Sequence, residues 1–317
     1  MPSLLEIFFF LAVGLVLLYA GAEALVRGSS DLASRLGVST LVIGLTIVAF
    51  GTSAPELVVS VKSSLNGMGD IAVGNVVGSN IFNIAVILGL SAIIKPIKVN
   101  LQVLRTDAPI MLALSLILVF LLGDSRISRI EGILLTAGIC GYTFFTVYMG
   151  RKQNIQSGEL VATTAELKKS GSVPFNLFSI LGGLAALVLG SRFFVKSAVD
   201  FAELMGISQA LVGLTIVAAG TSLPELATSV VAAARKQGDI AIGNIIGSNI
   251  FNILGILGIT SMISPLHIQG IGIVELCFMA GTAILLLPFM RTGFVLNRLE
   301  GVLLLGIYGG YLYYLWP

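Results

Sequence analysis

The stretch GTSAPEL, residues 51–57, returns almost unchanged as GTSLPEL at residues 220–226. The first copy directly follows the apolar run LVIGLTIVAF, residues 41–50, and the second follows a similar run. Threonine, serine, proline and glutamate are energetically unfavourable in such surroundings, because hydrocarbon offers no hydrogen-bond partners to the polar side chains or to the backbone groups that proline leaves unpaired. The two copies therefore indicate that one polar feature is built twice inside an apolar chain.

The repetition extends over the whole chain. GLTIVA at residues 44–49 recurs at 213–218, an offset of 169, and the same offset aligns DIAVGNVVGSNIFNI at 70–84 with DIAIGNIIGSNIFNI at 239–253. Self-similarity at a fixed offset is the signature of a duplicated structural unit. We predict a first repeat over residues 1–149, a polar linker over 150–174 and a second repeat over 175–317.

Composition indicates an integral membrane protein. Of 317 residues, 56% are hydrophobic and 11% are charged, whereas soluble domains carry about 25% charged residues. Apolar runs predict an all-α protein with ten transmembrane helices, five in each repeat. An odd number of spans makes the second repeat enter the membrane from the opposite side, so we expect two inverted five-helix repeats. The predicted spans are about 4–26, 38–65, 71–94, 106–122, 129–149, 175–197, 207–234, 240–263, 271–290 and 296–316.

The distribution of basic residues predicts the orientation. Thirteen of the 18 lysines and arginines fall on the side of the 150–174 linker in this topology. Because cytoplasmic loops are enriched in lysine and arginine, we predict a multi-pass cell-membrane protein with a cytoplasmic linker and both termini outside. The net charge of +2 gives no reason to expect a nucleic-acid partner. Cys140 and Cys277 lie far apart in apolar segments and are interpreted as small hydrophobic residues.

The GTS-x-PE motif is expected to break its helix. Pro55 lacks an N–H, and its ring collides with the carbonyl of Gly51 four residues earlier. The helix should kink or unwind near residues 50–55 and free one or more carbonyls. In a membrane, such groups are tolerated only inside the protein or beside a wet cavity.

The polar side chains around this break form a set of oxygen donors. Glu56 lies four residues after Thr52 and three after Ser53, so all three side chains can share one side of the helix. Ser79 and Asn83 in the next span are also four apart and can share a side. The second repeat supplies Thr221, Ser222, Glu225, Ser248 and Asn252. Hard oxygen donors suit Na⁺, Ca²⁺ or Mg²⁺, and a loose cage with two carboxylates favours Ca²⁺ over Mg²⁺.

Other polar residues in these spans have less certain roles. Asn75 and Asn244 suit either ion binding or packing. Asp70 and Asp239 begin their helices, where an acid complements the helix dipole, so we interpret them as capping residues.

At these motifs the sequence resembles the cation/calcium antiporter superfamily, and specifically its sodium/calcium exchanger branch, of the prokaryotic type with two alpha-repeats. The alpha-repeats correspond to residues 41–84 and 210–253, and the resemblance extends over essentially the whole chain. It implies ten helices in inverted repeats and alternating access about a site at the membrane midplane.

The resemblance also implies roles for individual residues. Glu56 and Glu225 correspond to paired carboxylates shared by Ca²⁺ and Na⁺. The hydroxyls of Thr52, Ser53, Ser79, Thr221, Ser222 and Ser248 correspond to flanking ligands, and the carbonyls of Ala49 and Ala218 to backbone ligands for Na⁺. Asn83 and Asn252 correspond to the residues that complete the central ring of ligands around the ion. Several relatives, the potassium-dependent exchangers among them, have an aspartate where this chain has Asn252, which weakens the case for K⁺ co-transport.

We therefore expect a secondary antiporter that exchanges Na⁺ for Ca²⁺ and works as a monomer in the lipid bilayer. The transported ions are Ca²⁺ and Na⁺, and no further cofactor is expected. The alternatives are a Ca²⁺/H⁺ antiporter that uses the same glutamates and, from another class, a passive cation channel. An enzyme is disfavoured because the sequence has no nucleophile–base pair and no cofactor motif.

Overall fold

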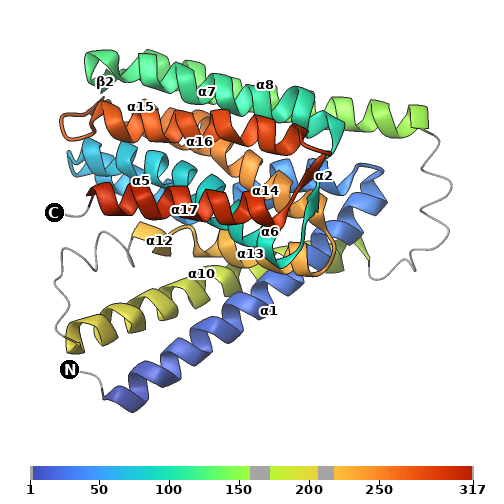
Figure 1. The fold of residues 1–317 in the computed structure, drawn as a ribbon, viewed down its shortest axis with the longest axis horizontal. Helices are drawn as coiled ribbons and strands as arrows, with labels where there is room; N and C mark the ends of the chain where they lie inside the picture. Colours follow the sequence, from blue (N-terminus) through green and yellow to red (C-terminus); the bar gives the residue numbers. More distant parts are fainter. Residues whose placement is uncertain (1–2, 158–171, 206–217, 316–317) are drawn as a thin grey trace.

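The computed structural model describes residues 3–157, 172–205 and 218–315, and it is helical almost throughout (Figure 1). In the first half the helices are α1 (Leu4–Leu36), α2 (Thr40–Ile43), α3 (Ala49–Thr52), α4 (Ala54–Leu65), α5 (Gly69–Phe82), α6 (Gly89–Ile94), α7 (Ala108–Leu121) and α8 (Arg129–Ser157). In the second half they are α10 (Val173–Leu204), α12 (Ala218–Gly220), α13 (Leu223–Ala234), α14 (Gly238–Phe251), α15 (Gly258–Ile263), α16 (Ile273–Arg291) and α17 (Arg298–Leu315).

Wider π-helical turns interrupt several of these helices without ending the span. They are η1 (Gly44–Val48), η2 (Asn83–Leu88), η3 (Val103–Asp107) and η6 (Asn252–Leu257), and one 3₁₀ turn, η4, covers Leu122–Asp124. Single π turns inside α-helices are frequent at functional sites. Here η2 and η6 begin at Asn83 and Asn252, two of the residues that the sequence predicts as ligands.

Seven helices within the described residues are long and apolar enough to cross a membrane, and an eighth is the bent pair Thr40–Thr52 and Ala54–Leu65. The prediction of an all-helical membrane protein is therefore confirmed. Two of the ten predicted spans are not in this count. The span 207–234 falls partly outside the described residues, where only α12 and the shorter apolar helix α13 represent it. The helix α17 occupies the span 296–316, but its tyrosines and charged first turn lower its hydropathy.

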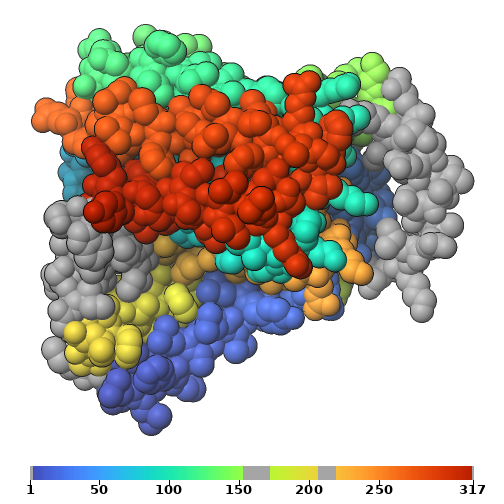
Figure 2. Space-filling view, viewed as in Figure 1, coloured from blue at the N-terminus to red at the C-terminus, as the bar shows by residue number. Residues whose placement is uncertain are grey.

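Two helical segments form the centre of the bundle. All of the most apolar 18-residue window in Gly238–Ile263 is buried, and 72% of the window in Gly69–Ile94, compared with 22% for α1 and for the helix Arg129–Lys152. Figure 1 shows α14 inside the bundle, with α8 along one edge and α1 and α10 along the other. In Figure 2, α16 and α17 cover the visible face of the bundle. The central segments contain the GN-x-x-GSN motifs, and the second copy, residues 243–249, is buried throughout.

Glycines bring α1 and α10 into backbone contact. A Cβ at Gly21 would lie 2.7 Å from the carbonyl oxygen of Gly183, and a Cβ at Gly190 would lie 2.9 Å from that of Gly14. Small residues of this kind allow membrane helices to approach closely. Because the residue number falls along α10 as it rises along α1, the two helices run antiparallel. They lie together as a separate layer beside the bundle (Figure 1).

In the described part of the chain, four two-residue strands tie the ends of the helices together. β1 (Ile97–Lys98) pairs with β4 (Val295–Leu296), and β2 (Arg126–Ile127) pairs with β3 (Leu266–His267). Both pairs are antiparallel, and each joins a connection of the first half to a connection of the second half. The two halves are therefore linked at their helix ends as well as through their cores.

Candidate functional site

The GTS-x-PE motif breaks its helix as predicted. The helix α3 ends at Thr52, α4 begins at Ala54, and the two parts of the span are bent by 45°. Pro55 lies in the first turn of α4, where a missing N–H costs no helical hydrogen bond. Ser53 occupies the break with φ −83° and ψ 7°, and Ser222 occupies the second break with φ −87° and ψ 8°.

The two breaks exchange hydroxyl–carboxylate contacts. Ser53 Oγ donates to Glu225 Oε1 at 2.8 Å, and Ser222 Oγ donates to Glu56 Oε1 at 3.0 Å. Ser222 Oγ also lies 3.1 Å from Ser79 Oγ, which brings the third span of the first half into the cluster. Each glutamate is therefore held by a serine from the other half of the chain. The two carboxylates are close enough to interact electrostatically.

Four buried oxygens near these contacts have no hydrogen-bond partner among the residues that the structure describes. They are Glu56 Oε2, Glu225 Oε2, Asn83 Oδ1 and Asn252 Oδ1. All four side chains are only 1% exposed, and neither glutamate forms an ion pair with any described residue. A buried unpartnered polar oxygen carries a large desolvation cost. Four of them together, two from carboxylates and two from amides, are a set of oxygens that a cation would satisfy.

Three of the remaining predicted ligands, Ala49, Ser248 and Thr221, make contacts on neighbouring helices. The carbonyl of Ala49 lies 3.4 Å from Thr52 Oγ1 and 3.5 Å from Ser248 Oγ, so α3 and α14 meet at this carbonyl. Thr221 follows α12, and its hydroxyl lies 3.5 Å from Asn75 Oδ1. Ala218 begins α12, but its side chain lies outside the described parts of the structure.

Comparison with known proteins decides the family. A family model described as sodium/calcium exchanger protein matches residues 6–148 and again residues 175–316. The chain belongs to this family. The family is one of exchangers that transport Ca²⁺ and Na⁺ across membranes, and its model matches once over each of the two halves that the sequence predicted as repeats.

Individual relatives of the exchanger family cover nearly the whole chain. The putative antiporter CaxA of Alkalimonas amylolytica is 40% identical over 310 residues, which span 96% of this chain and 97% of CaxA. The sodium/calcium exchanger MaX1 of Methanosarcina acetivorans is 35% identical over 340 residues, with 96% and 97% covered. A solved structure of the sodium-calcium exchanger NCX_Mj, soaked without Na⁺ and Ca²⁺, superposes with a TM-score of 0.85 at 32% identity and covers 99% of this chain and 100% of its own.

The role of Asn75 and Asn244, which the sequence left open, becomes clearer from their contacts in this exchanger. Asn75 Nδ2 donates to the carbonyl of Glu56 at 3.1 Å and to Ser60 Oγ at 3.0 Å. Asn244 Nδ2 lies 3.0 Å from Ser229 Oγ, and Asn244 Oδ1 accepts from Thr52 Oγ1 at 3.1 Å. Their amides are thus engaged by protein groups, so we interpret both residues as links between the broken helices and the central segments.

Asp70 does not act as the conventional helix cap that the sequence suggested. It lies in the first turn of α5, but its Oδ1 accepts backbone N–H groups of Gln269 and Gly270, both at 2.8 Å. These residues belong to the other half of the chain. Asp70 therefore joins the two halves at the end of the bundle, away from the oxygen cluster.

Sequence analysis missed Asn80 and Asn249 as parts of the cluster. Each lies three residues before a predicted ligand, and each bonds to the ligand of the opposite half. The repeated GSN motif was a usable signal, because a buried amide in a membrane helix needs partners. Which partner it finds depends on the packing of α5 against α14.

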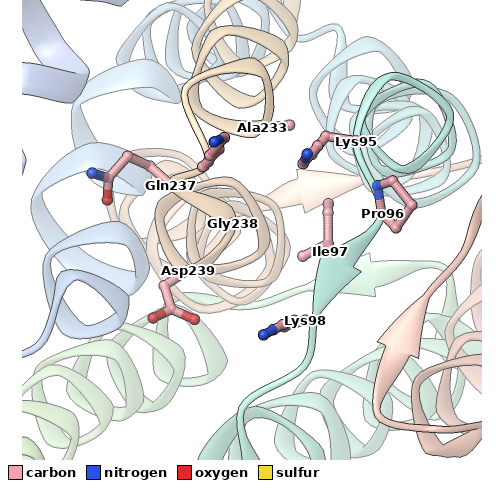
Figure 3. Close-up of a pocket in the computed structure, with 9 residues that line it drawn as sticks. Lys95, Pro96, Ile97, Lys98, Ala233, Gln237, Gly238 and Asp239 are labelled. Carbon is pink, nitrogen blue, oxygen red and sulfur yellow. The ribbon is translucent and has the colours of Figure 1, made fainter.

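A separate pocket of about 380 Å³ lies at the helix ends, beside the start of α14. Lys95 and Lys98 line it opposite Gln237 and Gly238 (Figure 3). Lys236 adds a third ammonium group, while Asp239 supplies the one carboxylate of the lining. This positive balance repels cations, so we do not assign the pocket to the cation site.

Proposed function

We propose that the chain is a secondary antiporter that exchanges Na⁺ for Ca²⁺ at one site between the two broken helices and the two central segments. The observation that carries the proposal is the group of four buried, unpartnered oxygens from Glu56, Glu225, Asn83 and Asn252. Ca²⁺ takes six to eight oxygen ligands in flexible geometry. The neighbouring hydroxyls and the carbonyls of Ala49 and Ala218 would supply the remaining positions for Ca²⁺ and Na⁺.

Competition for the two carboxylates provides the coupling. One Ca²⁺ or two Na⁺ neutralise Glu56 and Glu225, whereas Ca²⁺ and Na⁺ together leave excess positive charge in a site of low dielectric constant. The site therefore holds one kind of cargo at a time. Asn252 contributes a neutral oxygen, so the site needs no K⁺ to balance a third carboxylate.

We also propose ten transmembrane helices in two inverted repeats, bounded as 1–149 and 175–317, with the 150–174 linker in the cytoplasm and both termini outside. Two contacts support the inverted relation of the repeats. Gly14 and Gly21 of α1 correspond, at the offset of 169, to Gly183 and Gly190 of α10, and these helices run antiparallel. The same offset converts the β1–β4 pair into the β3–β2 pair. Both relations are expected of two halves related by a two-fold axis, and our proposal places this axis in the membrane plane.

Alternating access would arise from movement of α1 and α10 over the rest of the bundle. These two helices contact each other through glycines and are mostly exposed towards lipid. Within the described residues, the polar contacts of this layer with the bundle are those of Arg235 with Glu23 and Tyr19 and that of Ser191 Oγ with the carbonyl of Gly220. The layer can therefore slide if these few contacts break. The site would then open first to one side of the membrane and then to the other.

The decisive experiment is ⁴⁵Ca²⁺ uptake into proteoliposomes driven by an outward Na⁺ gradient with no pH gradient. Na⁺/Ca²⁺ exchange predicts uptake that requires internal Na⁺ and saturates with Ca²⁺. Uptake that instead follows an imposed pH gradient and ignores Na⁺ would support the Ca²⁺/H⁺ alternative. Single-channel currents in a planar bilayer would support the channel alternative.

A further inference from the structure

Two asparagine pairs cross between the halves next to the proposed site. Asn83 Nδ2 donates to Asn249 Oδ1 at 3.0 Å, and Asn252 Nδ2 donates to Asn80 Oδ1 at 2.9 Å. All four side chains are 1% exposed. Since an amide has one oxygen and one NH₂ group, using the nitrogen of Asn83 and Asn252 in these bonds leaves their oxygens free. Those oxygens are two of the four unpartnered oxygens of the cluster.

The outer amides are oriented in turn by groups that can only accept hydrogen bonds. Asn249 Nδ2 points to Met111 Sδ at 3.4 Å. Asn80 Nδ2 lies 3.9 Å from Met279 Sδ and 3.5 Å from the carbonyl oxygen of Asn249. A thioether sulfur and a carbonyl oxygen are acceptors without a hydrogen to donate. Both outer amides must therefore turn their nitrogen outwards and their oxygen towards the inner asparagine.

Exchanging the oxygen and nitrogen of any one amide would break this set of hydrogen bonds. If Asn249 flipped, its oxygen would face the sulfur of Met111 and its NH₂ group would face the NH₂ group of Asn83. Asn83 would then have to flip as well and present N–H donors to the cation. Because a cation attracts oxygen lone pairs and repels N–H dipoles, the two flipped amides would oppose cation binding.

From these hydrogen bonds we propose that Asn80 and Asn249 are positioning residues. Each fixes the direction of the amide oxygen of a cation ligand on the opposite half of the chain. Asn249 acts through Asn83, and Asn80 acts through Asn252. This inference rests on the proposed cation site. It assigns no new ligand, but it explains why amides can serve as ligands at positions where either end of the side chain fits.

A double-mutant cycle tests the crossed pairing directly. Asn249→Leu keeps the branched shape of the side chain, with two bulkier methyl groups, but removes the acceptor for Asn83. Loss of such a supporting contact usually weakens metal binding by about 10- to 100-fold. We expect this loss of Ca²⁺ affinity in an otherwise unchanged protein and in the Asn252→Ala background. In the Asn83→Ala background, Asn249→Leu should cause almost no further loss.

The reciprocal cycle serves as the matched control. Asn80→Leu should lose its effect in the Asn252→Ala background and keep it in the Asn83→Ala background. A residue that merely stabilises the fold would weaken binding equally in both backgrounds. A purely local effect would couple Asn80 to its sequence neighbour Asn83 and not to Asn252. Equal losses in both backgrounds, or coupling within one half, would overturn the proposal.

A conservative variant separates positioning from folding. Asn249→Asp keeps an oxygen that accepts from Asn83 Nδ2, so Ca²⁺ affinity should stay at or above its normal value, even if the leucine variant does not fold. Weakened Ca²⁺ binding in the folded aspartate variant would overturn the proposal. Equilibrium Ca²⁺ binding and the Tm without Ca²⁺ are measured for every variant. The cation site itself fails on a different result, namely normal Ca²⁺ affinity in Glu56→Gln, so the two failures are distinguishable.

Discussion

Replacing Glu56 by glutamine should weaken Ca²⁺ binding far more than Na⁺ binding. The side chain is 1% exposed, and within the described residues one of its carboxylate oxygens has no hydrogen-bond partner and no ion pair includes it. Glutamine keeps the shape and one oxygen but removes a full charge. At about 4 Å and an effective dielectric constant of about 20, one charge pair is worth about 4 kcal/mol. The loss is then at most about 4 kcal/mol for Na⁺ and about 8 kcal/mol for Ca²⁺.

These energies set the expected result of the assay. Since each 1.4 kcal/mol changes a binding constant tenfold, the upper limits are about three decades for Na⁺ and about six decades for Ca²⁺. Relief of the repulsion between Glu56 and Glu225 in the empty site reduces both losses. We still expect Ca²⁺ exchange in proteoliposomes to fall below detection. In calorimetric titrations, the logarithmic loss should be at least twice as large for Ca²⁺ as for Na⁺, because the relief of repulsion subtracts the same energy from both losses.

Two comparisons complete this test. Glu225→Gln should behave like Glu56→Gln, because both carboxylates are equally buried. Glu6→Gln makes the same chemical change at an exposed helix start, where glutamine also serves in a capping box, and it should leave exchange unchanged. Near-normal Ca²⁺ flux in either buried variant would refute the shared site. Equal logarithmic losses for Na⁺ and Ca²⁺ would refute the argument from charge.

Three further predictions address other parts of the site and fold, and a fourth addresses topology. Ser222→Ala removes the hydroxyl that holds Glu56 Oε1. A hydrogen bond to a charged group is worth about 1.5–3 kcal/mol, so KM for cations should rise about 10- to 100-fold, and an unchanged KM would contradict this role. Asn252→Asp adds a charge, so ions should bind more tightly and turnover should slow; a K⁺ requirement in the unaltered protein would contradict our interpretation of Asn252. Gly183→Ala places a Cβ against a backbone oxygen at 2.7 Å, whereas Gly182→Ala meets no described atom within 4 Å; only the former should lower the Tm, by an overpacking cost of about 1–3 kcal/mol. A cysteine introduced at Gly171, in a background without the native cysteines, should be labelled from the cytoplasm, and labelling from the outside would reverse the topology.

Much of the architecture follows from local physical rules that the sequence makes visible. Because Pro55 has no N–H, within a helical segment it can only begin a helix or interrupt one. A bend at this motif was therefore predictable, and the structure gives its angle as 45°. The membrane environment follows from composition in the same way. The family also follows from the sequence, because the two motifs and their spacing recur in both halves and the family model matches each half.

Contacts between distant residues were beyond the sequence. Ser53 and Glu225 are 172 residues apart, and Ser222 and Glu56 are 166 apart. Helical spacing shows that Ser53 and Glu56 share a face, but it does not show that each serine bonds to the other half's glutamate. That exchange depends on how the two broken helices approach each other around α5 and α14.

The sequence by itself determined which chemical groups are present: two glutamates, hydroxyls and amides at repeated spacing inside apolar helices. Only the tertiary structure decided which way the amides point. The oxygen and nitrogen of an asparagine are nearly the same size, so spacing and hydropathy cannot distinguish an Asn83 that offers its oxygen from one that offers its nitrogen. The choice is made by Met111 on another helix, because its sulfur can only accept a hydrogen bond. It therefore turns the nitrogen of Asn249 towards itself and the oxygen of Asn249 towards Asn83.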